Sequence, residues 1–132
     1  MDPIANMFSQ LKNAGAASHK EAKVAYSKMN LAILEILKSR GFINSFTPVT
    51  IDTQKYPIAI KVNLKFKNAK EMAFYDLKRI SRPGRRIYIS AKEINQRSRG
   101  KADILISTSK GVLSGHEAHK KGLGGELIGE VL

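Results

Sequence analysis

The segment from Ile58 to Lys67 places a large apolar side chain at every second position. Isoleucine, valine, leucine or phenylalanine fills positions 58, 60, 62, 64 and 66, and lysine or asparagine fills positions 61, 63, 65 and 67. A period of two is that of a β-strand, in which successive side chains point to opposite faces of the sheet. We therefore expect a half-buried strand with a basic outer face, paired in a hairpin with residues 49–53.

Helices are expected on the N-terminal side of this strand. The dipeptide Asp2-Pro3 is typical of a helix start, because aspartate caps the first turn and proline fits its first position. Apolar residues recur at positions 4, 7, 8 and 11 as one helical stripe, and Gly15 is expected to end the helix. The other elements expected here are a short strand or connector at residues 20–25 and a second helix from the cap Ser27 through Arg40.

The C-terminal half is predicted to consist mostly of short strands. The segment Ser81-Arg82-Pro83-Gly84 is a strong turn signal between two of them. Ser114 and Glu117 form a capping box, which predicts a short helix over residues 115–121. A polar loop without a clear period is expected at residues 94–99. The predicted strands cover residues 74–80, 87–91, 104–107 and 127–132.

These elements predict an α+β protein of two small lobes, a size that 132 residues allow. Residues 1–67 are expected to place two helices on a short sheet. Residues 68–132 are expected to form a mostly antiparallel β lobe with one short helix. The short polar segment 68–71 is the predicted boundary between the lobes.

The charge of the chain favours a polyanionic partner. Lysine and arginine number 23 against 11 acidic residues, which gives a formal net charge of +12 and a pI near 10.1. A pI above about 9 is typical of nucleic-acid-binding domains. The absence of cysteine excludes disulfides and thiolate metal sites and fits a reducing compartment. With no run of about 18 apolar residues and no signal peptide at its start, we expect no membrane partner and a cytosolic or organelle-matrix location.

An apolar strand runs directly into three small hydroxyl residues, Ser107, Thr108 and Ser109, which Lys110 and Gly111 follow. Packing does not require three hydroxyls at the end of a buried strand. A-form RNA displays its 2′-hydroxyl groups in a shallow minor groove, where small hydroxyl side chains fit. This segment is therefore predicted to contact RNA.

Glycines, arginines and one tyrosine complete the predicted RNA-binding set. The Gly124-Gly125 pair allows close backbone approach to a ligand. Planar guanidinium groups suit phosphate contacts, although a solvated charged turn is the alternative for the arginines. Tyr88 is predicted either to stack on a base or to be a strand tyrosine with one polar edge. The full set is Ser107, Thr108, Ser109, Lys110, Gly111, Gly124, Gly125, Glu126, Tyr88, Arg86, Arg85, Arg82, Arg79 and, on the polar face of the first helix, Lys12.

No constellation in the chain predicts catalysis, a cofactor or a metal. His116 and His119 are three residues apart, whereas the zinc protease box needs two histidines four apart. The segment that starts at Gly122 lacks the third glycine of a dinucleotide fingerprint and precedes a strand instead of opening a helix. No serine stands in a Gly-x-Ser-x-Gly elbow. We expect a chain that is not an enzyme and has no small-molecule substrate.

The order of these motifs resembles the universal small-subunit ribosomal protein S8 family, in its bacterial form. The most specific match is Ser-Thr-Ser-Lys-Gly at 107–111 with Gly-Gly-Glu at 124–126, both behind Ser-Arg-Pro-Gly at 81–84. The resemblance runs from end to end. Further matching segments are Asp2-Pro3-Ile4-Ala5-Asn6-Met7, Gly41-Phe42-Ile43 and Leu77-Lys78-Arg79-Ile80. The chain departs from the family at Gln10, where arginine is usual, at residues 100–103, and at its end, which lacks the usual aromatic residue.

The resemblance implies a two-lobed α+β protein that binds the central domain of small-subunit ribosomal RNA early in assembly. It implies that the C-terminal lobe grips an irregular RNA helix and that the N-terminal lobe adds contacts. The expected partners are this RNA and neighbouring small-subunit ribosomal proteins, and the free chain is expected to be monomeric. Bacterial members can also repress translation of their own messenger. The alternative is a basic module that binds RNA or an acidic protein outside any ribosome, and an organellar ribosome stays open.

Overall fold

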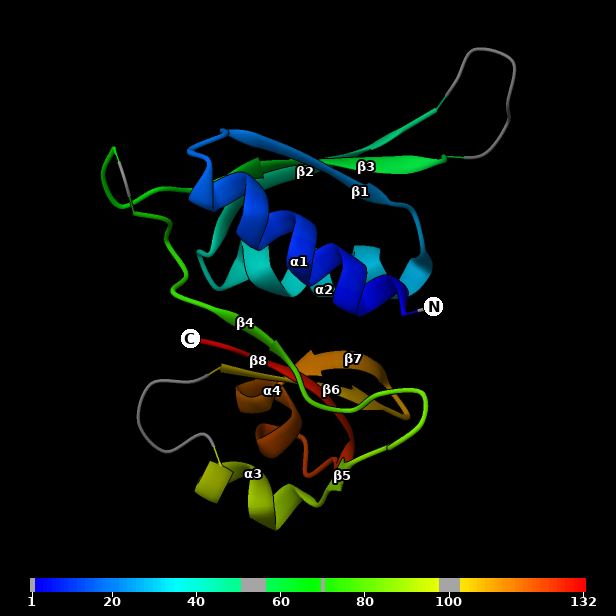
Figure 1. Ribbon diagram of the computed structural model, residues 1–132. Helices are drawn as coiled ribbons and strands as arrows, with labels where there is room; N and C mark the ends of the chain where they lie inside the picture. Colours follow the sequence, from blue (N-terminus) through cyan, green and yellow to red (C-terminus); the bar gives the residue numbers. More distant parts are fainter. Residues whose placement is uncertain (1, 51–56, 70, 98–102) are drawn as a thin grey trace. The chain divides into compact units, whose positions relative to one another are not determined.

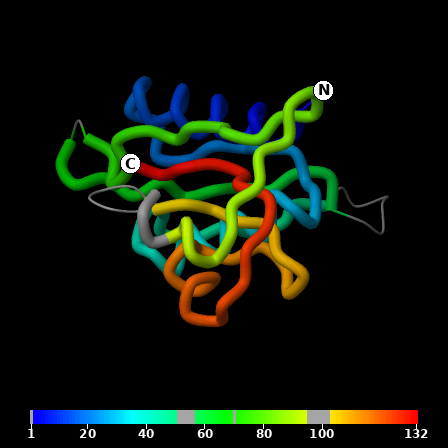
Figure 2. Tube along the Cα trace, turned by 90° about the horizontal axis from the view of Figure 1, so that it is seen from below, coloured from blue at the N-terminus to red at the C-terminus, as the bar shows by residue number. Residues whose placement is uncertain are grey.

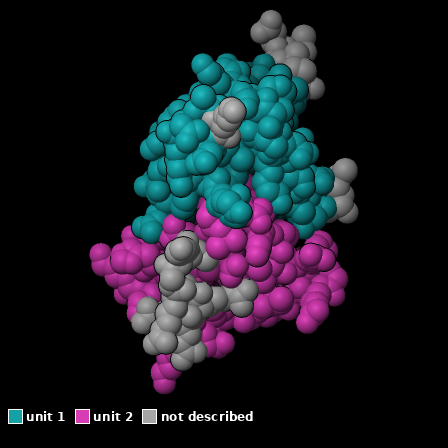
Figure 3. Space-filling view, turned by 60° about the vertical axis from the view of Figure 1, so that its left-hand side comes forward, with its two compact units in different colours: residues 1–75 teal, residues 76–132 magenta. Residues whose placement is uncertain are grey.

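The computed structural model describes residues 2–50, 57–69, 71–97 and 103–132 (Figure 1). The chain divides into two compact units, residues 1–75 and 76–132, which Figure 3 shows in different colours. The first unit holds two helices and a small sheet, and the second holds an antiparallel sheet with short helices. The predicted α+β class is therefore confirmed, while the predicted division into lobes 1–67 and 68–132 stays a prediction.

Both predicted helices of the first unit are present, as α1 (Pro3–Ala16) and α2 (Lys28–Ser39). The carboxylate of Asp2 accepts hydrogen bonds from two N–H groups in the first turn of α1, at 3.2 and 3.3 Å. The hydroxyl of Ser27 caps α2 in the same way, at 3.0 Å. Gly15 does not end α1, contrary to prediction. It lies inside the helix, where a Cβ would overlap the side chain of Met72, so its role is to make room for that side chain.

The sheet of the first unit contains β1 (Glu21–Ala25), β3 (Ala59–Leu64) and β2 (Ile43–Val49), in that order and antiparallel. The predicted alternation is confirmed within β3, since Ile60, Val62 and Leu64 are buried. It is wrong at Ile58, which precedes the strand and is 47% exposed, and Phe66 lies beyond the end of the strand. Figure 1 shows α1 and α2 together on one side of this sheet. On the strand positions between the buried ones, Lys23 lies directly opposite Lys61, as the predicted basic face requires.

The predicted antiparallel partner of β3 is present, but it lies mostly before the predicted residues 49–53. The partner is β2, which shares only Val49 with the prediction, and residues 51–53 lie outside the described part of the chain. A register shift between Ile43 and Ser45 interrupts the alternation of β2, so its sequence lacks the usual period of two. Pro48 is tolerated because β2 is an edge strand and needs fewer backbone donors.

The sheet of the second unit is built around its C-terminal strand, β8 (Gly125–Val131). Along one edge β8 pairs with β4 (Leu77–Arg79) and β5 (Tyr88–Ile89), and along the other with β6 (Asp103–Thr108). Strand β7 (Gly111–Ser114) pairs with β6 in a tight hairpin. The path of the chain through these strands can be followed in Figure 2. Strands β4 and β5 are shorter than predicted, and β7 was not predicted.

Helices α3 (Ala91–Arg97) and α4 (Gly115–Lys120) complete the second unit. Helix α4 confirms the predicted helix, and its first turn is capped by the hydroxyl of Ser114. Helix α3 replaces the loop predicted at residues 94–99, of which residues 98 and 99 lie outside the described part. Ser90 and Glu93 cap it reciprocally, because the N–H of Glu93 donates to Ser90 Oγ at 3.3 Å and the N–H of Ser90 donates to Glu93 Oε1 at 3.4 Å. Ile94 anchors the helix in the core.

Candidate RNA interface

One row of residues crosses the sheet of the second unit and joins three separate parts of the sequence. Tyr88 on β5 lies opposite Glu126 on β8, and Glu126 lies opposite Ser107 on β6. Directly opposed residues in an antiparallel sheet point to the same face. The next residues, Leu127 and Ile106, are buried in the core cluster. The side chains of the row therefore lie on the sheet face away from that cluster, and Tyr88 is 69% exposed.

The hydroxyl loop, residues 107–111, forms the tight turn between β6 and β7. The hydroxyl of Thr108 donates to the carbonyl of Gly111 at 2.8 Å and accepts from the N–H of Lys110 at 3.0 Å. Thr108 thus holds the turn closed. The hydroxyls of Ser107 and Ser109 have no hydrogen-bond partner among the described residues. Ser109 and Lys110 are exposed at the tip, so the loop presents a hydroxyl and a cation to solvent.

The two glycines beside this row are required by close approach of the backbone. A Cβ on Gly125 would overlap the carbonyl of Ser107 on the neighbouring strand. A Cβ on Gly124 would meet the carbonyl of Ile89. Both glycines therefore have a reason within the fold, and their predicted contact with RNA stays a prediction. Their effect is to bring the hydroxyl loop and the end of β5 close to β8.

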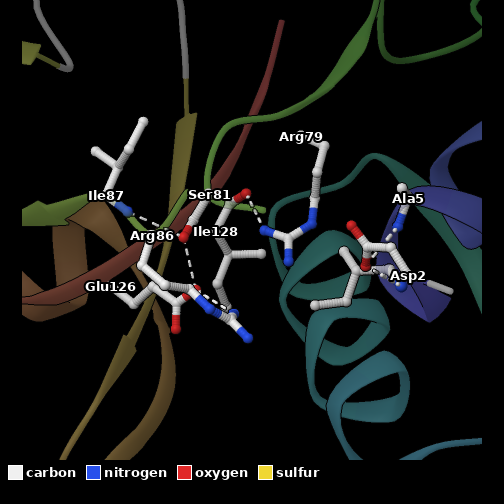
Figure 4. A network of polar contacts seen from close by, with 9 residues as sticks. Asp2, Ala5, Arg79, Ser81, Arg86, Ile87, Glu126 and Ile128 are labelled. Carbon is white, nitrogen blue, oxygen red and sulfur yellow. Dashed lines mark hydrogen bonds and ion pairs between the residues drawn. The ribbon is translucent and has the colours of Figure 1, made fainter. Parts of the chain in front are cut away.

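The arginine turn, residues 82–85, projects beside the start of β5. The main chains of Arg82 and Arg85 exchange two hydrogen bonds, at 3.0 and 2.9 Å, and both residues are exposed. The flanking arginines are held by the protein (Figure 4). Arg79 donates to the carbonyl of Ile128 at 2.8 Å, and Arg86 donates to Oε2 of Glu126 at 2.8 Å. The turn thus presents two exposed guanidinium groups between two that the fold orients.

Glu126 is an ionised acid in this basic surface. Its Oε2 accepts from the hydroxyl of Ser81 at 2.7 Å as well as from Arg86. The hydrogen bond from Ser81 is the largest cause that lowers the pKa of Glu126, and Arg86 adds a hydrogen bond and its positive charge. Partial burial of the carboxylate acts in the opposite direction. The carboxylate is therefore charged at neutral pH and fixed by two donors.

Comparison with known proteins decides the family. The family model described as "Ribosomal protein S8" matches residues 2–132. A small ribosomal subunit protein uS8 of Dictyoglomus thermophilum is 43% identical over 127 residues, which cover 96% of this chain and 94% of that protein. The uS8 protein of Mycoplasmopsis pulmonis is 41% identical over 127 residues, with 96% and 93% covered. The chain belongs to the ribosomal protein S8 family.

This membership confirms the predicted resemblance and the predicted class, a structural ribosomal protein and not an enzyme. Of the residues predicted to bind RNA, the S8 fold gathers those of the second unit around the row of Tyr88, Glu126 and Ser107. Lys12 lies on α1 and is described with the first unit. Among the described residues, no three histidine, cysteine or acidic side chains group as metal ligands. No helix in the described ranges combines the length and the apolar character that crossing a membrane demands.

The sequence analysis did not identify Ser81 as a residue that supports this surface from below. Ser81 appeared only as the first residue of a turn signal, whereas the structure buries it completely and bonds it to Glu126. The sequence contains no indication of this role beyond the presence of a serine at position 81. Turn chemistry explains Pro83 and Gly84, but a hydroxyl that ends up fully buried is explained only by its partners.

Proposed function

We propose that this S8-family chain binds the central domain of small-subunit ribosomal RNA through the sheet face that carries Tyr88, Glu126 and Ser107. The hydroxyl loop and the arginine turn extend this face on two sides. On this proposal the chain supports assembly of the small subunit, alongside neighbouring ribosomal proteins. The free chain is monomeric, and the protein functions as a component of the ribosome in the cytoplasm.

The observation that carries the proposal is the cross-strand row itself. It places a half-buried serine hydroxyl, a fixed carboxylate and an exposed aromatic ring side by side on one face. The hydroxyls meet ribose 2′-OH groups or base edges in the shallow groove of an RNA helix. Tyr88 stacks on an unpaired base, which an irregular helix supplies. A sheet face that contacted only solvent would not require a serine hydroxyl, a fixed carboxylate and an aromatic ring side by side.

Phosphate contacts come from the exposed cations on either side of the row. The residues proposed for this role are Arg82 and Arg85 on the arginine turn, the flanking Arg79 and Arg86, and Lys110 on the hydroxyl loop. Such contacts fix the position of the protein on the RNA and carry little sequence information. Discrimination between RNAs therefore falls to Ser107, Ser109 and the neighbouring backbone.

Filter binding at several salt concentrations tests this division of roles. The RNA is a fragment of the central domain, compared with a regular duplex of equal length. Arg82→Ala should lower the slope of log affinity against log salt by about 0.7–0.9 for the lost phosphate contact. Lys120→Ala is the matched control, because it also removes one exposed positive charge, from α4, which packs on the core cluster at the other face of the sheet. Ser109→Ala should leave the slope unchanged and reduce the preference for the fragment. Equal slopes for Arg82→Ala and Ser109→Ala would contradict the proposal.

Two further parts of the proposal have their own tests. Sedimentation of the protein with the small subunit, with release only by high salt or RNase, supports the ribosomal role. A soluble, ribosome-free pool would favour the alternative, a basic module that binds RNA or an acidic protein elsewhere. Repression of the chain's own messenger requires a site in that messenger which competes with the ribosomal fragment. A competition titration with the messenger measures that directly.

A further inference from the structure

Ser81 lies at the base of the arginine turn, where its hydroxyl has two partners. It accepts from the N–H of Ile87 at 3.1 Å and donates to Oε2 of Glu126 at 2.7 Å (Figure 4). Ser81 is 0% exposed, so water does not compete for either bond. Because this hydroxyl both donates and accepts a hydrogen bond, its orientation is fixed, and it in turn fixes the orientation of both partners.

The main chain closes the base of the turn without this hydroxyl. The N–H of Ser81 donates to the carbonyl of Leu127 at 3.1 Å, and the N–H of Leu127 donates to the carbonyl of Ile87 at 2.9 Å. Both ends of the segment 82–86 are thus anchored on β8 by backbone bonds. The hydroxyl adds something different, namely the orientation of the Glu126 carboxylate and, through it, of the Arg86 guanidinium.

We propose that Ser81 is a positioning residue for RNA binding, which holds Glu126 and thereby Arg86 in the geometry that receives RNA phosphates. This inference rests on the proposed function of the surface. Arg86 is bound to the carboxylate at 2.8 Å, so it follows any rotation of Glu126. Without the Ser81 hydroxyl, Oε2 keeps Arg86 as its partner but loses its second anchor. The guanidinium then has to be ordered by the RNA itself, which weakens binding.

The test compares Ser81→Ala with a matched control, Ser114→Ala. Ser114 is also a buried serine of the second unit, and its hydroxyl caps α4 by accepting from the N–H of Glu117 at 3.3 Å. Ser81→Ala should weaken binding to the ribosomal fragment about tenfold, the size of one buried hydrogen bond to a charged group. Ser114→Ala should change binding less than about twofold at a similar cost in urea stability. Ser81→Thr, which keeps a hydroxyl, should recover most of the affinity. Equal losses for the two alanine variants would overturn the inference.

A second measurement needs no RNA and reports on Glu126 directly. Carbon-detected NMR titration of the Glu126 carboxyl should give a higher pKa in Ser81→Ala than in the wild type, and an unchanged pKa in Ser114→Ala. In a Glu126→Gln background, Ser81→Ala should lose most of its effect on RNA affinity, because the charged intermediary is gone. Additive effects of the two substitutions would overturn the inference. Wild-type protein without preference for the fragment would instead refute the proposed function, a result distinct from Ser81→Ala binding normally.

Discussion

Replacing Gly125 with alanine should destabilise the second unit, because the new methyl group has no room. A Cβ at position 125 would overlap the carbonyl of Ser107 and lie 3.2 Å from Cα of Thr108. These are backbone atoms of the paired strand, so β6 and β8 must move apart. Forced overpacking costs about 1–3 kcal/mol, and each weakened ladder hydrogen bond adds up to about 1 kcal/mol. We expect the free energy of unfolding to fall by ~2–4 kcal/mol.

Urea unfolding followed by circular dichroism measures this loss. Gly84→Ala is the control, because nothing lies within 4 Å of a Cβ built at that position. Its free energy of unfolding should stay within about 0.5 kcal/mol of the wild type, as for an ordinary surface substitution. RNA affinity should fall further for Gly125→Ala than the unfolded fraction explains, since Ser107 is displaced with its strand. Equal urea midpoints for the two variants would refute the reasoning about close strand approach.

Three further outcomes are expected. The lowered pKa of Glu126 means that its stabilisation is complete above the ordinary value of 4.5 and is lost as the pH falls below it. Urea midpoints of Glu126→Gln and the wild type should therefore differ at neutral pH and converge in strong acid; a constant difference would contradict this. Ser109→Ala should weaken binding to the RNA fragment about fivefold to tenfold at unchanged stability, whereas Thr108→Val should lower both, because Thr108 closes the turn. Ser90→Ala should reduce stability by ~1 kcal/mol in the same urea assay by removing the cap of α3, and an unchanged midpoint would argue against the cap.

Elements with strong local signals could be predicted from the sequence alone. The caps at Asp2, Ser27 and Ser114 mark helix starts that the structure confirms. The strict alternation around Ile60 marks β3. Each of these signals lies within a few residues of the element that it predicts, so no tertiary information was needed.

The predictions were wrong where the local sequence pattern was weak, or where contacts between distant residues determine the structure. Ser90 and Glu93 form the same capping pattern that located α4, but the polar composition after Ile94 obscured it. The pairing partner of β3 depends on a bulge and on an edge proline, which no local period reveals. Gly15 was expected to end α1, but a glycine stands there because the side chain of Met72 leaves no room for a Cβ. Met72 lies far along the chain, so no local pattern reveals this contact. Residue type alone selected the hydroxyl loop, which the structure places at the turn between β6 and β7, and its contact with RNA stays a prediction. The buried position of Ser81 depends on the fold and could not be predicted from the sequence.

The acid in the middle of a basic surface has a physical use. A free arginine loses side-chain entropy when it binds a phosphate, and this loss reduces affinity. Arg79 and Arg86 lose much of that freedom during folding, because the carbonyl of Ile128 and the carboxylate of Glu126 already hold them. Arg82 and Arg85 are exposed on the turn and keep this freedom. On the proposed function, the first pair would therefore contact phosphates at a fixed spacing, and the second pair would adapt to the RNA backbone as it binds. Glu126 lowers the local positive charge and so weakens non-specific attraction, and in exchange it gives Arg86 a defined direction.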